Sequence, residues 1–488
     1  MQQDAPPPPP RSLPHALVGI EIRESKIEFR PLRFTKMRIP FLPPCTLAFV
    51  CLSFSAVQPV AAQPIDDTQA KQVIIFGRHG VRTPVVPNGT LNAFSALVFP
   101  VFPNVPGGPP LGVGVLTPSG AVDETILGGY FRAWLINEGL LGADDSVNAG
   151  LVYFRANDIP LIADTAAAFW TGMLPAAPVT INTYTAPAID PLFNPLGAGV
   201  AVLDYQMAVA AVNGRLGDNP QSLATAYAPE LALARSILFD YPAGETPVPA
   251  APAGKVDVTD LISNPITVTT GNTSQPVNLG SLAEVIPAID PFVMEYADGL
   301  APADVGWGQL TPAGNSQIFR LYDLALDLEY RTPYLARVQS SNLASHIVRS
   351  LVQAATGHPM PGALASPTTQ VIALIAANTN IAGLAGLFHL DWLVPGYQPD
   401  VSAPSGALVF ELRQSQRTGE YVVRTSYVTQ TMDQLRNQTP LTLEAPPASV
   451  PVFVPGCSVD NATLDCPLGR FVEVANQLID PNSADLVN

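Results

Sequence analysis

Lysine and arginine are scarce in this chain: 24 of its 488 residues are basic and 40 are acidic. Proteins that bind nucleic acid through the phosphate backbone need clustered cations, so this class is excluded. Cysteine is scarce as well, with four residues, and no apolar run after residue 62 reaches the roughly 20 residues that span a bilayer. The apolar fraction of 47% is typical of a globular protein and not of a disordered one.

Residues 1–62 differ from the rest of the chain. A run of five prolines lies in a polar opening segment. From Met37 there follow a basic start, a long apolar stretch and small residues ending at Ala62, the layout of a secretory signal peptide. We predict that residues 1–36 are upstream read-through or disordered, that residues 37–62 are a signal peptide, and that the mature protein is periplasmic or secreted without a membrane attachment. The alternative is a membrane anchor, although two prolines interrupt its apolar part.

The chain without residues 1–62 is more acidic still. That segment carries seven of the 24 basic and four of the 40 acidic residues, which leaves 17 and 36 and a formal charge of −19. Cys457 and Cys466 are the cysteines that remain, close together in sequence. In an exported protein such a pair most simply forms a disulfide, and the metal-site alternative lacks further Cys or His nearby.

Apolar runs and helix signals alternate along the chain. Short runs rich in β-branched residues predict buried strands at 72–76, 151–154 and 371–376. Helices are predicted from Pro118, with Thr117 as the N-cap, and over 165–174, 316–329, 335–353 and 381–388, the last with an Asn or Thr cap. A hairpin is predicted over 407–428. Strands separated by helices indicate an α/β fold, a sandwich with a central, mostly parallel sheet flanked by helices.

The local amino-acid composition of the chain changes between residues 182 and 304. This segment consists of Ala-rich helical pieces broken by Pro-Gly loops. We predict one α/β domain built from residues 63–181 and 305–488, and an inserted, mainly helical domain over residues 182–304.

The motif Arg78-His79-Gly80-Val81-Arg82 directly follows the first predicted strand. Ligands of open α/β sheets bind beyond the carboxyl ends of the strands. Two guanidiniums can contact phosphate oxygens in pairs, and an imidazole nitrogen between them can attack phosphorus. The alternative is a solvated basic loop with a capping histidine. Two arginines around one histidine, in a chain with so few cations, favour an anion site.

This motif resembles the Arg-His-Gly-x-Arg-x-Pro signature of the histidine acid phosphatase family, particularly the bacterial periplasmic phytases and glucose-1-phosphatases. The resemblance covers nearly all of the chain after residue 62. It implies an α/β sandwich with an inserted helical domain over the active site. It also implies that His79 is the nucleophile, forming a phosphohistidine, and that Arg78 and Arg82 hold the transferred phosphoryl group. No cofactor or metal is implied, because the arginines neutralise the developing charge.

Three positions depart from the family pattern. The family has a His-Asp pair after a later strand, whereas this chain has Ala377 and Asn378. Ala377 replaces a phosphate-binding histidine, and Asn378 replaces the proton-donating aspartate, although an amide has no proton to release near neutral pH. Leu161 stands where a third arginine is expected. These losses predict impaired acid catalysis.

Other ionisable residues offer no clear substitute for the missing acid. His389 lies about three helical turns beyond Asn378, roughly 16 Å along the axis. We interpret His389 and Asp391 as ordinary helix-end residues. Asp158 and Asp164 lie near the expected edge of the site and stay open as alternatives.

The segment after the motif bears on the substrate. Thr83–Phe131 contains no Lys or Arg, whereas it includes Phe94, Phe99 and Phe102. A site for a heavily phosphorylated substrate such as phytate should carry several cations around its mouth. We therefore predict poor phytase activity and a small phosphate monoester with an apolar or neutral alcohol.

Two hypotheses follow for function. The first is an exported phosphomonoesterase that acts through His79 and favours esters with good leaving groups. The second is a catalytically inactive family member that keeps the motif in order to bind phosphate or a phosphoester. Both need the same fold, so the fold does not distinguish between them.

Overall fold

The computed structural model describes residues 66–103, 108–178, 180–242 and 249–485 of the chain. The predictions for residues 1–36 and 37–62, an upstream segment and a signal peptide, lie outside this part. Within the described ranges, no helix combines the length and apolar character that would let it cross a bilayer.

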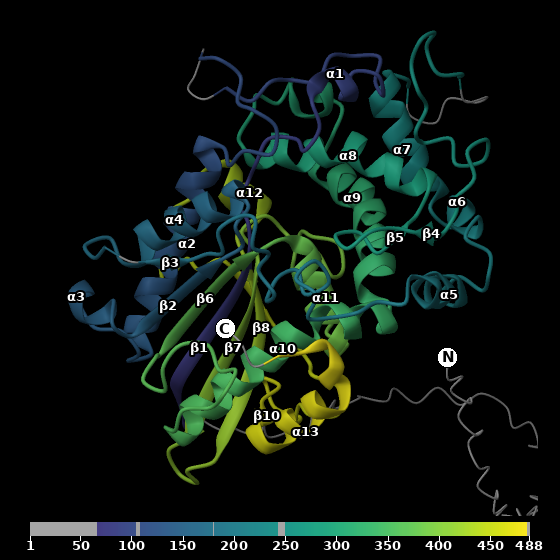
Figure 1. The fold of residues 1–488 in the computed structure, drawn as a ribbon. Coiled ribbons are helices and arrows are strands. Elements are labelled where there is room, and N and C mark those ends of the chain that lie inside the picture. The colour runs from purple at the N-terminus through teal and green to yellow at the C-terminus, as the bar shows by residue number, and fades with distance from the viewer. Residues whose placement is uncertain (1–65, 104–107, 179, 243–248, 486–488) are drawn as a thin grey trace, which may run out of the picture. The chain divides into compact units, whose positions relative to one another are not determined.

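A mixed sheet of eight strands forms the centre of the fold (Figure 1). The strands are β1 (Thr68–Arg78), β2 (Val152–Ala156), β3 (Ile181–Asn182), β6 (Val371–Ala376), β7 (Ala407–Ser415), β8 (Tyr421–Thr429), β9 (Ala448–Pro451) and β10 (Cys466–Pro467). Their order is β10-β8-β7-β1-β6-β2-β3, with β9 also paired to β8. The pairs β1–β6, β6–β2 and β2–β3 are parallel, and β7 and β8 form the predicted antiparallel hairpin. The predicted α/β class is confirmed.

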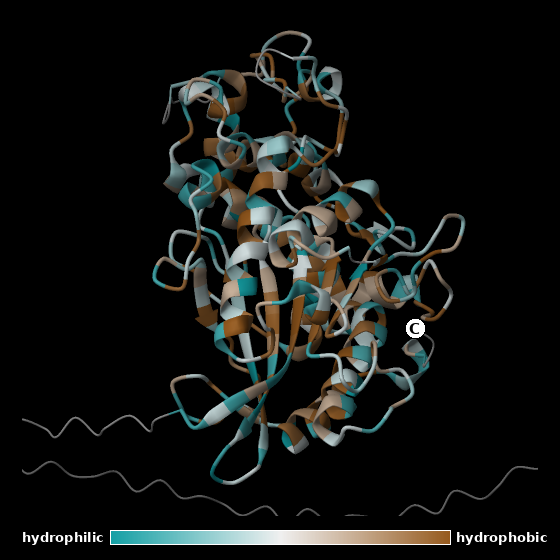
Figure 2. Ribbon diagram, turned by 90° about the vertical axis from the view of Figure 1, so that its left-hand side faces the viewer, coloured by the Kyte–Doolittle hydropathy of each residue, from teal (hydrophilic) through white to brown (hydrophobic). Residues whose placement is uncertain are grey.

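Helices cover both faces of the sheet, which explains the apolar runs in its central strands (Figure 2). Successive side chains of a strand point to opposite faces. Val73 and Ile75 therefore pack towards one helical layer, and Ile74 and Phe76 pack towards the other. The first layer contains α2 (Pro118–Asn137) and α4 (Pro160–Met173), and the second contains α10 (Pro333–Thr356), α11 (Asn378–Phe388) and α13 (Leu468–Leu478).

A second apolar core lies among helices beyond the sheet. It is built mainly by α5 (Tyr205–Arg215), α6 (Ser222–Ala226), α7 (Ala228–Phe239), α8 (Ser281–Ala297) and α9 (Pro312–Leu326), beside the short ribbon of β4 (Thr269–Thr270) and β5 (Val277–Asn278). Short elements complete the described chain: α1 (Asn88–Leu91), α3 (Asp145–Asn148), α12 (Met432–Arg436), η1 (Val305–Gly308), η2 (Asp327–Arg331) and η3 (Pro481–Ser483). The predicted boundaries of an inserted domain at 182 and 304 stay a prediction.

Local sequence signals place several element ends. Thr117 caps α2 as predicted, with its hydroxyl oxygen accepting from the backbone N–H of Gly120 at 3.0 Å. The predicted cap of the helix after β6 was wrong, because α11 already begins at Asn378. The side-chain oxygen of Asn380 accepts from the backbone N–H of Ala377 instead. Cys457 and Cys466 form the predicted disulfide.

Candidate active site

The arginine-histidine motif lies at the carboxyl end of β1, as the sequence predicted. Arg78 is the last residue of β1 and is in register with Ala376, the last residue of β6. The backbone N–H of His79 donates to the carbonyl of Ala376 over 3.0 Å. Because β1 and β6 are parallel neighbours, the segment Arg78–Pro84, called the nucleophile loop below, and the start of α11 lie at the same edge of the sheet.

The first turn of α2 supports the nucleophile loop from behind. The backbone N–H of Thr117 donates to the carbonyl of Val81 over 3.0 Å. A Cβ atom added to Gly120 would lie 2.3 Å from that same carbonyl oxygen, so only glycine permits this approach. The contact fixes the backbone two residues beyond His79.

His79 is a buried and neutral imidazole. Its exposed fraction is 5%. Burial lowers the pKa of His79 well below its usual value, the charges of Arg78 and Arg82 lower it further, and a hydrogen bond with Gly80 opposes the shift. Nδ1 lies 2.9 Å from the carbonyl oxygen of Gly80. Since a carbonyl can only accept, Nδ1 carries the proton and Nε2 holds a lone pair, the form that a nucleophile needs.

Both arginines of the nucleophile loop are buried and have partners. The guanidinium of Arg82 donates to both carboxylate oxygens of Asp290 on α8, over 2.8 and 3.0 Å. Burial alone would lower the pKa of Arg82, but the charge and hydrogen bonds of Asp290, together with Tyr322, raise it. Arg78 donates to the backbone carbonyl of Ser402. A phosphate at this site would have to compete with Asp290 for Arg82.

Two of the degenerate positions are apolar and packed. Leu161 lies buried in the first turn of α4. Ala377 packs against an apolar cluster that includes Ile162 and Ile375. These contacts replace the cationic and hydrogen-bonding groups that the family resemblance implies, so neither position can contact a phosphate through a charge.

Asn378, the expected place of the proton donor, is buried at the start of α11. Its side-chain Nδ2 donates to the phenolic oxygen of Tyr322 on α9 over 3.0 Å. The amide therefore positions a tyrosine but has no acidic proton of its own.

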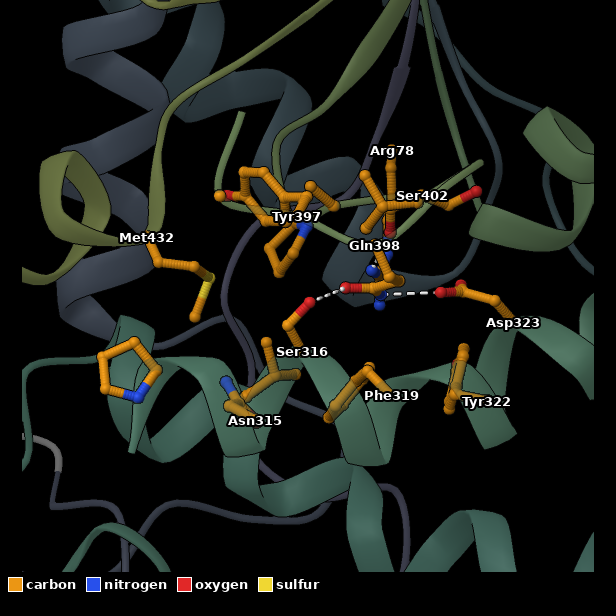
Figure 3. Close-up of a pocket in the computed structure, with 16 residues that line it drawn as sticks. Arg78, Asn315, Ser316, Phe319, Tyr322, Asp323, Tyr397, Gln398, Ser402 and Met432 are labelled. Carbon is orange, nitrogen blue, oxygen red and sulfur yellow. Dashed lines mark hydrogen bonds between the residues drawn. The ribbon is translucent and has the colours of Figure 1, made fainter. Parts of the chain in front are cut away.

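Two cavities border the nucleophile loop. Arg78, Phe319 and Tyr322 line a small one of about 30 Å³ (Figure 3). Arg82, Asn378 and again Tyr322 line a larger one of about 250 Å³. Tyr322 thus borders both cavities, each of which contains one of the two arginines.

Two buried carboxyl groups lie behind the nucleophile loop. A Cβ atom on Gly80 would lie 2.9 Å from Oε1 of Glu124 on α2. Burial raises the pKa of Glu124 to about 8, against a smaller lowering by a hydrogen bond with Ser405. Burial raises the pKa of the adjacent Asp123 to about 9. In the described part of the chain, no group of three or more His, Cys, Asp or Glu is arranged to hold a metal ion, and a metal-free reaction stays a prediction.

The structure places the substitute residues considered from the sequence as follows. His389 is the C-cap of α11, in the left-handed conformation. Asp391 accepts from Arg331 over 2.5 Å. Asp158 and Asp164 are exposed.

Sequence reasoning missed Asp290 and Tyr322. Asp290 is the single charged residue between Ile286 and Met294, and an isolated acid in an apolar helix signals a buried partner. Tyr322 carried no comparable signal, since an aromatic residue at helical spacing is usually part of a core.

Comparisons with known proteins agree with the arrangement of the motifs. A family model described as the histidine phosphatase superfamily (branch 2) matches residues 69–229. The chain is 29% identical to the phytase AppA of Escherichia coli (strain K12) over an alignment of 425 residues. This alignment covers 86% of this chain and 94% of that protein. The chain is 26% identical over 433 residues to a glucose-1-phosphatase of Salmonella typhimurium, covering 88% and 97%. A Hafnia alvei phytase in complex with tartrate matches with a TM-score of 0.75 and 29% identity, covering 86% and 99%.

Proposed function

We propose, from the premise that this chain belongs to branch 2 of the histidine phosphatase superfamily, that it is an exported phosphomonoesterase acting through a phosphohistidine at His79. One observation carries the proposal: His79 is neutral, its Nδ1 proton is donated to Gly80, which leaves the lone pair on Nε2, and the charges of Arg78 and Arg82 act on the same ring. Arg78 and Arg82 would hold the transferred phosphoryl group and neutralise the charge that develops on it.

Acid catalysis in this enzyme would be weak. Asn378 has no proton to donate, and Ala377 and Leu161 add no charge to the site. Loss of a positioned acid commonly reduces a rate by about two to four orders of magnitude. The enzyme would therefore favour esters whose leaving group departs without being protonated, such as aryl phosphates.

The substrate we propose is a small phosphate monoester. The segment Thr83–Phe131 adds no cation to the surroundings of the site, and the arginines of the nucleophile loop suffice for one phosphate group. Phe99 and Phe102 are buried in apolar clusters, so they contribute to packing and do not line a solvent-exposed entrance to the site. A polyanion such as phytate would meet few compensating charges here, so we expect poor phytase activity.

Export rests on two features. Residues 37–62 have the pattern of a signal peptide, and the disulfide between Cys457 and Cys466 suits an oxidising compartment. The test is the mass of the exported chain, which should begin near Gln63. A chain that retains residues 37–62 would contradict the proposal.

The second candidate is a catalytically inactive protein that binds phosphate or a phosphoester. The ion pair between Arg82 and Asp290 favours it, because this pair already satisfies one of the two arginines. Calorimetric titration with inorganic phosphate decides: binding without turnover, lost on changing Arg78 and Arg82, would support this candidate.

Hydrolysis of an aryl phosphate at acid pH tests the enzyme. Wild type should be active and His79→Ala should be at background. The double change Ala377→His with Asn378→Asp restores the residues that the family resemblance implies, and it should raise the rate on an alkyl phosphate, whose leaving oxygen needs a proton. If wild type and His79→Ala are both at background, the phosphatase proposal is lost.

A further inference from the structure

The phenolic group of Tyr322 lies at the place where a proton donor is missing. Tyr322 is partly buried on α9, and its oxygen is 3.0 Å from Nδ2 of Asn378. The charges of Arg78 and Arg82 also act on the phenol of Tyr322. The ring borders the cavity with Arg78 (Figure 3), and it also borders the cavity with Arg82. A hydroxyl group is therefore next to both phosphate-binding candidates.

The hydrogen-bond partners of Tyr322 determine where its proton can go. A phenol has one proton to donate and two lone pairs to accept with. The amide Nδ2 of Asn378 can only donate, so it occupies a lone pair of the phenolic oxygen. The proton of Tyr322 is not used in this bond and is left for another group.

Three carboxyl groups near Tyr322 are already held by other partners. Asp323 lines the cavity with Arg78, burial raises its pKa to about 7, and it accepts from Gln398 over 2.6 Å. Asp290 accepts from Arg82 with both of its oxygens and is held as an ion pair. Glu329 lines the same cavity as Tyr322, and burial raises its pKa to about 7. It lies seven residues further along, however, which is roughly 10 Å along a helix axis, and it accepts from Gln275 over 2.8 Å.

We propose that Tyr322 is the proton donor of the phosphatase reaction, in place of the carboxylic acid that Asn378 cannot supply. This proposal rests on the function proposed above. Nε2 of His79 forms a bond to phosphorus, and the ester P–O bond breaks with its electron pair going to the leaving oxygen. That oxygen takes the proton of Tyr322, giving the free alcohol and a phenolate beside Arg82.

The second half of the reaction restores the enzyme. The phenolate of Tyr322 accepts a proton from water as the water oxygen bonds to phosphorus. The P–N bond breaks, and its electron pair returns to Nε2 of His79. Phosphate leaves, and both side chains regain their starting protonation. Burial and the charge of Asp290 raise the pKa of Tyr322, and the charges of Arg78 and Arg82 offset part of this rise, which favours the phenolate between the two steps.

A tyrosine donor would act selectively on poor leaving groups. An alkoxide is more basic than a phenolate, so proton transfer from Tyr322 to it is downhill. A nitrophenolate is less basic than a phenolate and departs without a proton. Removal of the hydroxyl group should therefore affect alkyl phosphates and spare nitrophenyl phosphate.

The experiment compares Tyr322→Phe with wild type on 4-nitrophenyl phosphate and glycerol 2-phosphate. We expect kcat/KM for the alkyl ester to fall by about 100-fold or more, while the nitrophenyl ester changes by less than about 3-fold. Retained activity on the nitrophenyl ester shows that the variant is folded. Glu329→Gln is the matched control, since it removes another acid from the same cavity and should not change the ratio of the two rates.

The possible failures separate this proposal from the proposed function. An equal loss on both esters would mean that Tyr322 positions groups and donates no proton, which overturns the proposal. A selective loss in Glu329→Gln alone would assign the donor to Glu329 and also overturn it. Hydrolysis that is the same in His79→Ala as in wild type would instead refute the phosphatase function itself.

Discussion

Asp123 makes the stability of the fold depend on pH, and the substitution Asp123→Asn measures this dependence. Asp123 is buried on α2, and in the described part of the chain neither of its carboxyl oxygens has a hydrogen-bond partner. Burial, together with the charges of the neighbouring Glu124 and Asp298, raises the pKa of Asp123 from 3.8 to about 9. At pH 7 this carboxyl is protonated in the folded protein and ionised in the unfolded chain.

Folding at neutral pH must therefore take up a proton at Asp123, which reduces the free energy of unfolding. The penalty is absent below about pH 3.8, grows by about 1.4 kcal/mol per pH unit above it, and stops growing near pH 9. At pH 7 it amounts to at most about 4 kcal/mol. Asparagine has a similar shape and no proton to take up, so the variant should become more stable than wild type as the pH rises.

Urea unfolding at pH 4, 6 and 8 checks this expectation. The free energy of unfolding of Asp123→Asn, relative to wild type, should rise by about 2 to 4 kcal/mol between pH 4 and pH 8. Glu444→Gln is a control at an exposed position and should follow wild type. If Asp123→Asn and wild type show the same dependence on pH, Asp123 is not a buried acid held neutral by the fold, and the reasoning is refuted.

Two further substitutions probe the contacts of the nucleophile loop. Asp290→Asn removes the charge that competes with phosphate for Arg82. A unit charge at about 4 Å opposes an anion by about 1 kcal/mol even in water, so phosphate should bind to the variant about 5-fold tighter or more by calorimetry. Unchanged affinity would mean that phosphate does not approach Arg82. Gly120→Ala places a Cβ atom against the carbonyl of Val81 and should lower the free energy of unfolding by about 1 to 3 kcal/mol. Gly129→Ala on the same helix, which meets open space, should not, and equal effects of the two would contradict the contact.

The parts of the fold that the sequence predicts are those set by local chemistry. The run Val371–Ala376 is apolar at every position, as a strand covered on both faces must be. Thr117 and Pro118 mark a helix start through the hydrogen bond of one and the fixed backbone angle of the other. The motif around His79 is likewise recognisable because its residues are neighbours in the chain.

The remaining parts of the site depend on packing between distant segments. Asp290 is 208 residues from Arg82 in sequence, and nothing in either segment indicates which acid pairs with which arginine. Phe99 was expected near a mouth because of its place in the chain, but it packs edge-on against Trp307 with ring centroids 4.8 Å apart. The side-chain contacts of the site depend on how α8 and α9 pack over the nucleophile loop. This packing cannot be read from the composition of the chain.

Trapping of the phosphorylated enzyme tests most directly whether this chain is a phosphatase. Wild type mixed with 4-nitrophenyl phosphate, quenched in alkali and digested, should give a peptide with phosphate on Nε2 of His79, because Nδ1 donates to Gly80. His79→Ala should give no labelled peptide. Phosphate on another residue, or on Nδ1, or no labelled peptide from a wild type that hydrolyses the ester, would contradict a phosphohistidine at Nε2 of His79.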